Sequence, residues 1–168
     1  MKKGIIILFL VSLGFLFKNP QEEIIIPNDA IRFRVIANSN SAFDQQEKMI
    51  IKEQVEKEVY ALINGAQNVT EVRSLIEDNL DTIEEIVEEY QVPYQIHYGN
   101  NYFPAKYYKG ITYPAGNYES LVITLGSGAG KNFWCVLFPP LCLPENTEED
   151  ISDVDYRLYV KKLLDGSK

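Results

Sequence analysis

The stretch from Tyr113 to Cys142, YPAGNYESLVITLGSGAGKNFWCVLFPPLC, decides the fold of this 168-residue chain. Two apolar runs in it, residues 118–125 and 132–138, have the composition of β-strands. The Gly-rich residues from Gly126 to Gly130, with Lys131, separate them, which predicts a β-hairpin with a slightly long turn. Three interpretations of the stretch compete: a phosphate loop, a catalytic thiol site, or a rigid hairpin that displays a surface.

Upstream of this stretch the sequence predicts one strand and a first helix. In residues 31–36, IRFRVI, apolar side chains alternate with Arg32 and Arg34, which is typical of a half-buried strand. Ser41 followed by Asp44 resembles a helix N-cap with an acidic first turn. Apolar residues then recur at helical spacing up to Ile63, and Asn64-Gly65 is a stop signal.

A second helix and a short strand follow. Asn68 and Glu71 form a plausible capping box, and the apolar stripe after them continues to the stop at Pro93. Residues 94–98, YQIHY, then predict a short strand that ends at Gly99.

This order of elements, with contiguous helices followed by a run of strands, predicts an α+β fold. We expect a two-layer sandwich in which two helices pack on one face of a mainly antiparallel sheet. The other face carries exposed residues, several tyrosines among them.

The chain divides into four parts. Residues 1–18 combine a positive start with a short apolar run, which predicts a signal peptide or an N-terminal membrane anchor. Residues 19–29 form a linker, and residues 30–143 form the folded domain. Residues 144–168 form an acidic tail with a possible last strand or short helix. Because the lysines at positions 2 and 3 stay in the cytoplasm, the domain is expected on the far side of a membrane.

Composition excludes several classes of function. A net charge of −8 with no basic stripe argues against nucleic acid and against anionic membrane surfaces as partners. Two cysteines and one histidine are too few for a metal site, and no cofactor motif is present. The Pro-Pro pair between Cys135 and Cys142 either turns the chain so that the sulfurs form a disulfide, or leaves two buried free thiols.

The enzymatic interpretations of the stretch are weak. A Walker A loop needs four residues between its glycines, then a lysine, a Ser or Thr, and a helix. Here three residues separate Gly126 from Gly130, and the sequence that follows is predicted to be a strand. Cys135 or Ser127 is a conceivable nucleophile with His97 as the base. Ser127 lacks the Gly-x-Ser-x-Gly elbow, and Cys135 alternates into a strand, where thiols are inert.

Two blocks of the sequence resemble the stage II sporulation protein R family. They are residues 31–55, IRFRVIANSNSAFDQQEKMIIKEQV, and the stretch from Tyr113 to Cys142. The resemblance covers almost the whole expected exported part, from Ile31 to Cys142. Its mild departures are Ala42, where proline or a charged residue is more usual, and Phe133, where tryptophan often stands.

The resemblance implies a function that composition does not show. Members of this family are made in the forespore and exported into the space between the two cells. There they trigger a membrane-embedded aspartic protease that processes pro-sigma-E. The resemblance therefore implies a non-catalytic signalling protein whose partner is that protease.

The family motif supplies candidate partner-binding residues. In the first block they are Arg34, Asn38, Ser39, Asp44, Gln45 and Lys48; in the second they are Tyr113, Pro114, Gly116, Trp134, Pro139 and Pro140, together with the cysteine pair. We expect Tyr113 to be exposed, so that its replacement spares folding and impairs processing. The alternatives are a cell-envelope binding module or, less favoured, a cysteine or serine hydrolase that uses Cys135 or Ser127 with His97.

Overall fold

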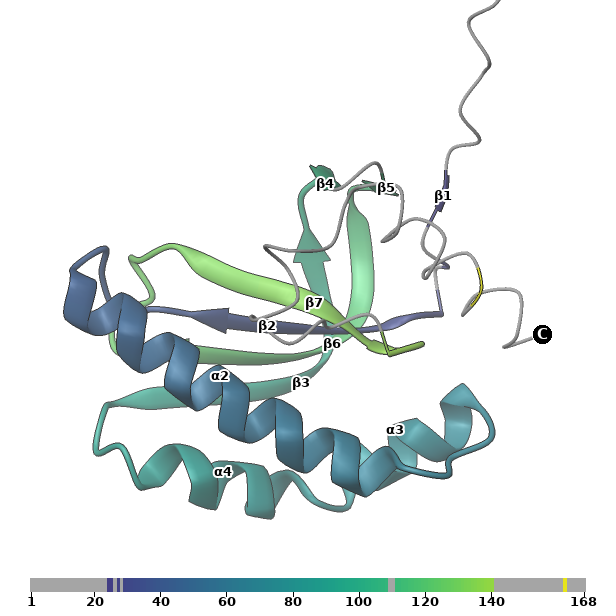
Figure 1. Cartoon of the computed structure of the whole chain (residues 1–168), viewed down its shortest axis with the longest axis horizontal. Coiled ribbons are helices and arrows are strands. Elements are labelled where there is room, and N and C mark those ends of the chain that lie inside the picture. Colours follow the sequence, from purple (N-terminus) through teal and green to yellow (C-terminus); the bar gives the residue numbers. More distant parts are fainter. Residues whose placement is uncertain (1–23, 26, 28, 109–110, 141–161, 163–168) are drawn as a thin grey trace, which may run out of the picture.

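A computed structural model describes residues 24–25, 27, 29–108, 111–140 and 162 of the chain. Its centre is a four-stranded sheet in the order β3-β6-β2-β7. These strands span Ile31–Ile36 (β2), Tyr94–Phe103 (β3), Gly116–Leu125 (β6) and Asn132–Phe138 (β7). Figure 1 shows the helices that precede β3 on one side of this sheet, which is the predicted two-layer α+β arrangement.

The pairing of the strands corrects the predicted hairpin. β6 and β7 are not neighbours, because β2 lies between them, parallel to β6 and antiparallel to β7. β3 pairs antiparallel with β6, so two of the three pairings are antiparallel and the sheet is mainly, though not wholly, antiparallel. The Gly-rich loop therefore passes over the end of β2 rather than closing a hairpin.

The first helix begins and ends where the sequence predicts. α2 spans Ala42–Ile63, and the side chain of its N-cap, Ser41, accepts a hydrogen bond from the Asp44 N–H at 3.0 Å. The helix stops at Asn64, and Gly65 takes a φ of +93°, a left-handed conformation that glycine adopts without strain.

The predicted second helix is two helices. α3 spans Val69–Glu77 and α4 spans Leu80–Glu88, with a break between them at which the Asn79 side chain donates to the Leu75 carbonyl at 2.7 Å. The N-cap of α3 is confirmed, since Asn68 Oδ1 accepts from the Glu71 N–H at 3.0 Å.

A second, three-stranded sheet has the order β1-β5-β4, with β1 at Ile24–Ile25, β4 at Lys106–Tyr108 and β5 at Ile111–Tyr113. It lies beside the far ends of β3 and β6, away from the helices (Figure 1). β3 is longer than predicted, because the chain continues as a strand through Gly99 to Phe103.

One face of the four-stranded sheet forms the main core with the helices. The odd-numbered side chains of β2 point into it, as the alternation predicts. The fully buried aliphatic and aromatic residues of this core include Phe33, Val35, Ile51, Val55, Val59, Val72, Ile76, Ile83, Val87, Leu121, Ile123 and Leu125.

Candidate functional site

The first motif and the Gly-rich loop are joined by hydrogen bonds. Asn38 Oδ1 accepts from the Ser127 N–H at 2.9 Å, and the Asn38 carbonyl accepts from the Ala129 N–H at 3.1 Å. On the same loop, the Lys131 N–H donates to Asn40 Oδ1 at 2.8 Å. The two sequence blocks that carry the family resemblance therefore meet at one end of the sheet.

Close packing explains two glycines of this loop. Gly126 has a φ of +54°, and a Cβ there would overlap the Asn38 side chain. A Cβ on Gly130 would overlap the Ser39 carbonyl oxygen, which is backbone and has little room to move. The loop accordingly needs glycine for its own packing, and it leads into strand β7 rather than into a helix that would bind phosphate.

The start of α2 ties the same two loops together. Asp44 accepts hydrogen bonds from the Ser39 hydroxyl and from Asn38 Nδ2, and the Ser39 hydroxyl is the main cause of its lowered pKa. Gln45 Nε2 donates to the Ser39 carbonyl at 2.9 Å. Lys48 Nζ donates to Gln45 Oε1 at 2.8 Å. Five candidate residues of the first block thus form one network, whose evident role is to hold the loops in place.

The opposite face of the sheet carries a cluster that joins three of the candidate residues, Arg34, Tyr113 and Trp134, to residues that the sequence did not single out. Arg32 is fully buried, and its guanidinium carbon lies 3.3 Å from the centre of the Tyr118 ring. The rings of Phe103 and Trp134 lie 5.2 Å and 5.8 Å from the same carbon. We call this the arginine–aromatic cluster; its members are Arg32, Arg34, Phe103, Lys106, Tyr113, Tyr118 and Trp134.

The buried guanidinium of Arg32 has an unusual environment. None of its three nitrogens has a hydrogen-bond partner in the part of the chain that the structure describes. Burial lowers the pKa of Arg32, although an arginine keeps its proton under ordinary conditions. Among the described residues, its charge is therefore stabilised by the negative faces of aromatic rings and not by a carboxylate.

Two further cations border Trp134. Lys106 Nζ lies 4.6 Å from the centre of the Trp134 ring. Arg34 is directly opposite Trp134 in the β2–β7 ladder, and its Nε and Nη2 reach the amide oxygen of Asn132 at 2.8 Å and 2.7 Å when that oxygen faces the guanidinium. Lys106 is exposed, whereas Arg34 and Trp134 are half-buried.

The expectation that Tyr113 is exposed is wrong. Only 5% of its surface is accessible, because its ring packs edge-on against Trp134 at a centroid distance of 5.2 Å. The neighbouring turn is held by a hydrogen bond of its own, in which the Tyr118 hydroxyl donates to the Pro114 carbonyl at 2.9 Å. A Cβ on Gly116 would lie 3.2 Å from the Tyr118 ring, so this turn is fitted closely around that tyrosine.

The end of β7 holds the remaining candidates. Cys135 is disulfide-bonded, and the chain has one other cysteine, Cys142, which lies outside the described residues. The predicted pairing therefore stays a prediction. Pro139 is buried after a cis peptide bond, and Pro140 is exposed.

The structure does not bring the residues of the hydrolase interpretation together. His97 lies on the edge strand β3 and Cys135 on the opposite edge strand β7, with two strands between them. At about 4.8 Å per strand the two positions are roughly 14 Å apart. Cys135 is also engaged in a disulfide, and the Ser127 hydroxyl donates to the Asn38 carbonyl at 2.8 Å.

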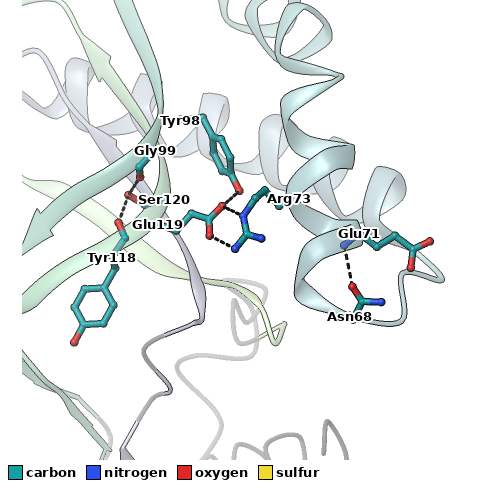
Figure 2. Close-up of polar contacts among 8 residues, drawn as sticks. All are labelled: Asn68, Glu71, Arg73, Tyr98, Gly99, Tyr118, Glu119 and Ser120. Carbon is teal, nitrogen blue, oxygen red and sulfur yellow. Dashed lines mark hydrogen bonds and ion pairs between the residues drawn. The ribbon is translucent and has the colours of Figure 1, made fainter.

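Sequence reasoning also missed an ion pair between α3 and the sheet. Figure 2 shows Arg73 and Tyr98 converging on Glu119. Arg73 Nε and Nη2 each donate to the carboxylate at 2.7 Å, and the Tyr98 hydroxyl donates at 2.7 Å. The Arg73 hydrogen bonds lower the pKa of Glu119, while burial and then the Glu119 bond raise the pKa of Tyr98.

The described residues contain neither a candidate metal site nor a candidate membrane-spanning helix. No group of three or more histidine, cysteine or acidic side chains in them is arranged to hold a metal ion. Nor does any helix among them have the length and apolar character needed to cross a membrane.

Comparison with known proteins identifies the family. The sequence profile described as stage II sporulation protein R matches residues 27–148. The chain is 38% identical over 160 residues to the stage II sporulation protein R of Bacillus subtilis strain 168, an alignment that covers 84% of this chain and 71% of that protein. No solved structure matches the chain. The motif that joins the two loops and the strand that carries Trp134 both lie within the matched region, and the chain belongs to the stage II sporulation protein R family.

Proposed function

We propose that this protein is an exported, non-catalytic sporulation signal that activates a membrane-embedded aspartic protease in the neighbouring cell. The protease then removes the pro-sequence of sigma-E. The observation that carries the proposal is the family match over residues 27–148, which includes both motif blocks. In this proposal residues 1–18, which lie outside the described residues, direct export from the forespore into the intermembrane space, where the domain stays secreted or anchored.

The geometry of the site supports a signalling role over a hydrolytic one. Of the groups that a hydrolase would need, Cys135 is held in a disulfide and Ser127 is bonded to Asn38. The motif residues instead hold loops to each other and bury an arginine among rings. Such side chains build a stable surface, and a surface is what a protein ligand needs.

An activator of this kind acts by differential affinity. A ligand shifts an equilibrium only if it binds the active state more tightly than the inactive one. We therefore propose that the domain binds the outward-facing part of the protease and favours its active state, with a coupling free energy of about 1–3 kcal/mol.

Co-expression in a host that does not sporulate tests the proposal. The host produces the protease, pro-sigma-E and the exported chain, and processing is followed by the mobility of the sigma factor on a gel. We expect cleavage only when all three are present and the chain is exported. A chain lacking residues 1–18 is the control for export. Failure of the full set to yield processed sigma-E contradicts a direct trigger.

A further inference from the structure

The arginine–aromatic cluster concentrates positive charge on a chain that is otherwise acidic. The whole chain carries a net charge of −8, yet Arg32, Arg34 and Lys106 lie around one tryptophan. They come from two different sheets, since Lys106 belongs to β4 and the arginines to β2. The fold therefore assembles a basic spot that the sequence itself does not display as a basic run.

The charge at the base of this cluster lacks a counter-ion among the described residues. Arg32 is fully buried, and none of its three guanidinium nitrogens has a hydrogen-bond partner in the described part of the chain. In a medium of low dielectric constant, an uncompensated charge interacts strongly with a charge that approaches it. A carboxylate that reaches the surface above the cluster thus gains attraction from Arg32 without touching it.

The surface above the buried arginine can be touched by a partner. Lys106 is exposed, and Trp134 and Arg34 are half-buried. Tryptophan and arginine are the residue types that contribute most to binding at protein interfaces, where they lie beside contacts that exclude water. At this spot the positive charges attract an acidic segment, although the protein as a whole is negatively charged.

We infer that the arginine–aromatic cluster docks an acidic segment of the partner protein, with its carboxylates on Lys106 and Arg34 and an apolar side chain against Trp134. The inference rests on the proposed function, because it gives the chemistry of the surface that the activated protein presents. An anionic bilayer fits less well, since a chain with a charge of −8 is repelled by such a surface as a whole.

Charge reversal in the full chain tests the inference. Lys106→Glu and Arg34→Glu are each compared with Lys57→Glu, which makes the same kind of charge change on an exposed position of α2 far from the cluster. Processing of pro-sigma-E is measured in the three-component host at several expression levels. We expect either cluster variant to need on the order of tenfold more chain for half-maximal processing, and Lys57→Glu to match the wild type. Thermal melts of the purified chains separate loss of binding from loss of folding.

The outcomes distinguish this inference from the function on which it rests. A wild-type chain that never triggers processing overturns the proposed function. A wild-type chain that triggers processing while Lys106→Glu and Arg34→Glu do so equally well overturns the docking site. Rescue of Lys106→Glu by a lysine substituted for an acidic residue of the partner supports it.

Two other occupants are tested directly. Binding of the wild type, but not of Lys106→Glu, to vesicles of phosphatidylglycerol assigns the cluster to lipid and overturns the inference. The acidic tail of this chain is tested by changing Glu145, Glu148 and Glu149 to glutamine. If that variant reproduces the defect of Lys106→Glu, the tail is the occupant and the inference fails.

Discussion

The side of the four-stranded sheet that meets the helices is built from different residues than the side that faces away. On the helix side, Phe33, Leu121 and their neighbours form a core of aliphatic and aromatic side chains. On the other side, the alternate positions of the same strands bury Arg32 among rings. Adjacent residues of β2 are therefore buried to the same extent for different physical reasons.

This difference suits the two sides of the sheet to different tasks: the helix side to stability and the opposite side to recognition. Apolar burial stabilises a fold in proportion to the area removed from water, which makes the helix side the main source of stability. Burial of an unpaired charge is unfavourable unless other interactions compensate for it. Aromatic rings compensate the charge of Arg32 among the described residues, and the inferred docking surface gives it a role beyond stability.

The largest expected effect comes from truncating the core on the helix side. Phe33 is fully buried, so Phe33→Ala removes ring contacts and leaves a cavity. We expect the free energy of unfolding to fall by about 3–5 kcal/mol. Denaturant unfolding of the purified domain measures this value, with Phe43→Ala, whose ring is 71% exposed, as the matched control. Equal losses for the two variants would contradict the assignment of the core.

A smaller loss is expected when an aromatic ring is removed from the other side. Tyr113 is 5% exposed and packs against Trp134, but it belongs to a three-stranded sheet that can relax around the gap. Tyr113→Ala should reduce the free energy of unfolding by about 2–3 kcal/mol. Tyr107→Ala, at a ring that is 69% exposed, should stay within about 0.5 kcal/mol of the wild type. If the Tyr113 variant is as stable as the Tyr107 variant, the result supports the sequence-based prediction that Tyr113 is exposed.

The sequence predicts the parts of this fold that depend on local physics. The alternation around Arg32 and Arg34 identifies which side of β2 meets the helices, and the caps at Ser41 and Asn68 locate two helix starts. The sequence does not predict the features that depend on contacts between distant segments, such as the order of the strands. The pattern of β6, Gly-rich loop and β7 is typical of a hairpin, whereas the pairing of β2 with both strands shows that β2 lies between them.

The candidate site shows the same limit. Five of the six candidate residues of the first block come together as one network, but the sequence does not distinguish residues that hold a loop from residues that contact a partner. Arg32 was missed because charged residues on an alternating strand usually face water. The rings that cover it come from β3, β6 and β7, and no local pattern indicates that they converge.

Replacing the buried arginine is expected to stabilise the protein, whereas the truncations above destabilise it. Arg32→Met fills similar volume with a flexible apolar side chain and removes a charge that has no partner among the described residues. We expect the free energy of unfolding to rise by about 1 kcal/mol, because apolar substitutes for buried ions are neutral or stabilising. Thermal and denaturant melts measure the change. A loss comparable to that of Phe33→Ala would mean that the rings stabilise the cation more than burial destabilises it, and the contrast between the two sides would disappear.

The smallest effect concerns the ion pair between α3 and the helix side of the sheet. Arg73 lowers the pKa of Glu119 in the folded protein, so the pair adds stability above the ordinary glutamate pKa of about 4.3. That contribution is lost as the pH falls through the lowered folded value. Because the Arg73 side chain is 37% exposed, solvent screens the pair, and we expect it to contribute about 0.5 kcal/mol.

Unfolding measured at pH 7 and at pH 3 for the wild type and for Glu119→Gln isolates this contribution. The variant lacks the titrating group, so the difference between the two proteins should shrink at the lower pH. Arg73→Gln should show the same convergence. If the difference between the wild type and Glu119→Gln instead grows on acidification, the folded pKa of Glu119 is raised rather than lowered. Burial of Glu119 would then outweigh the hydrogen bonds from Arg73 and Tyr98, both of which favour the ionised carboxylate.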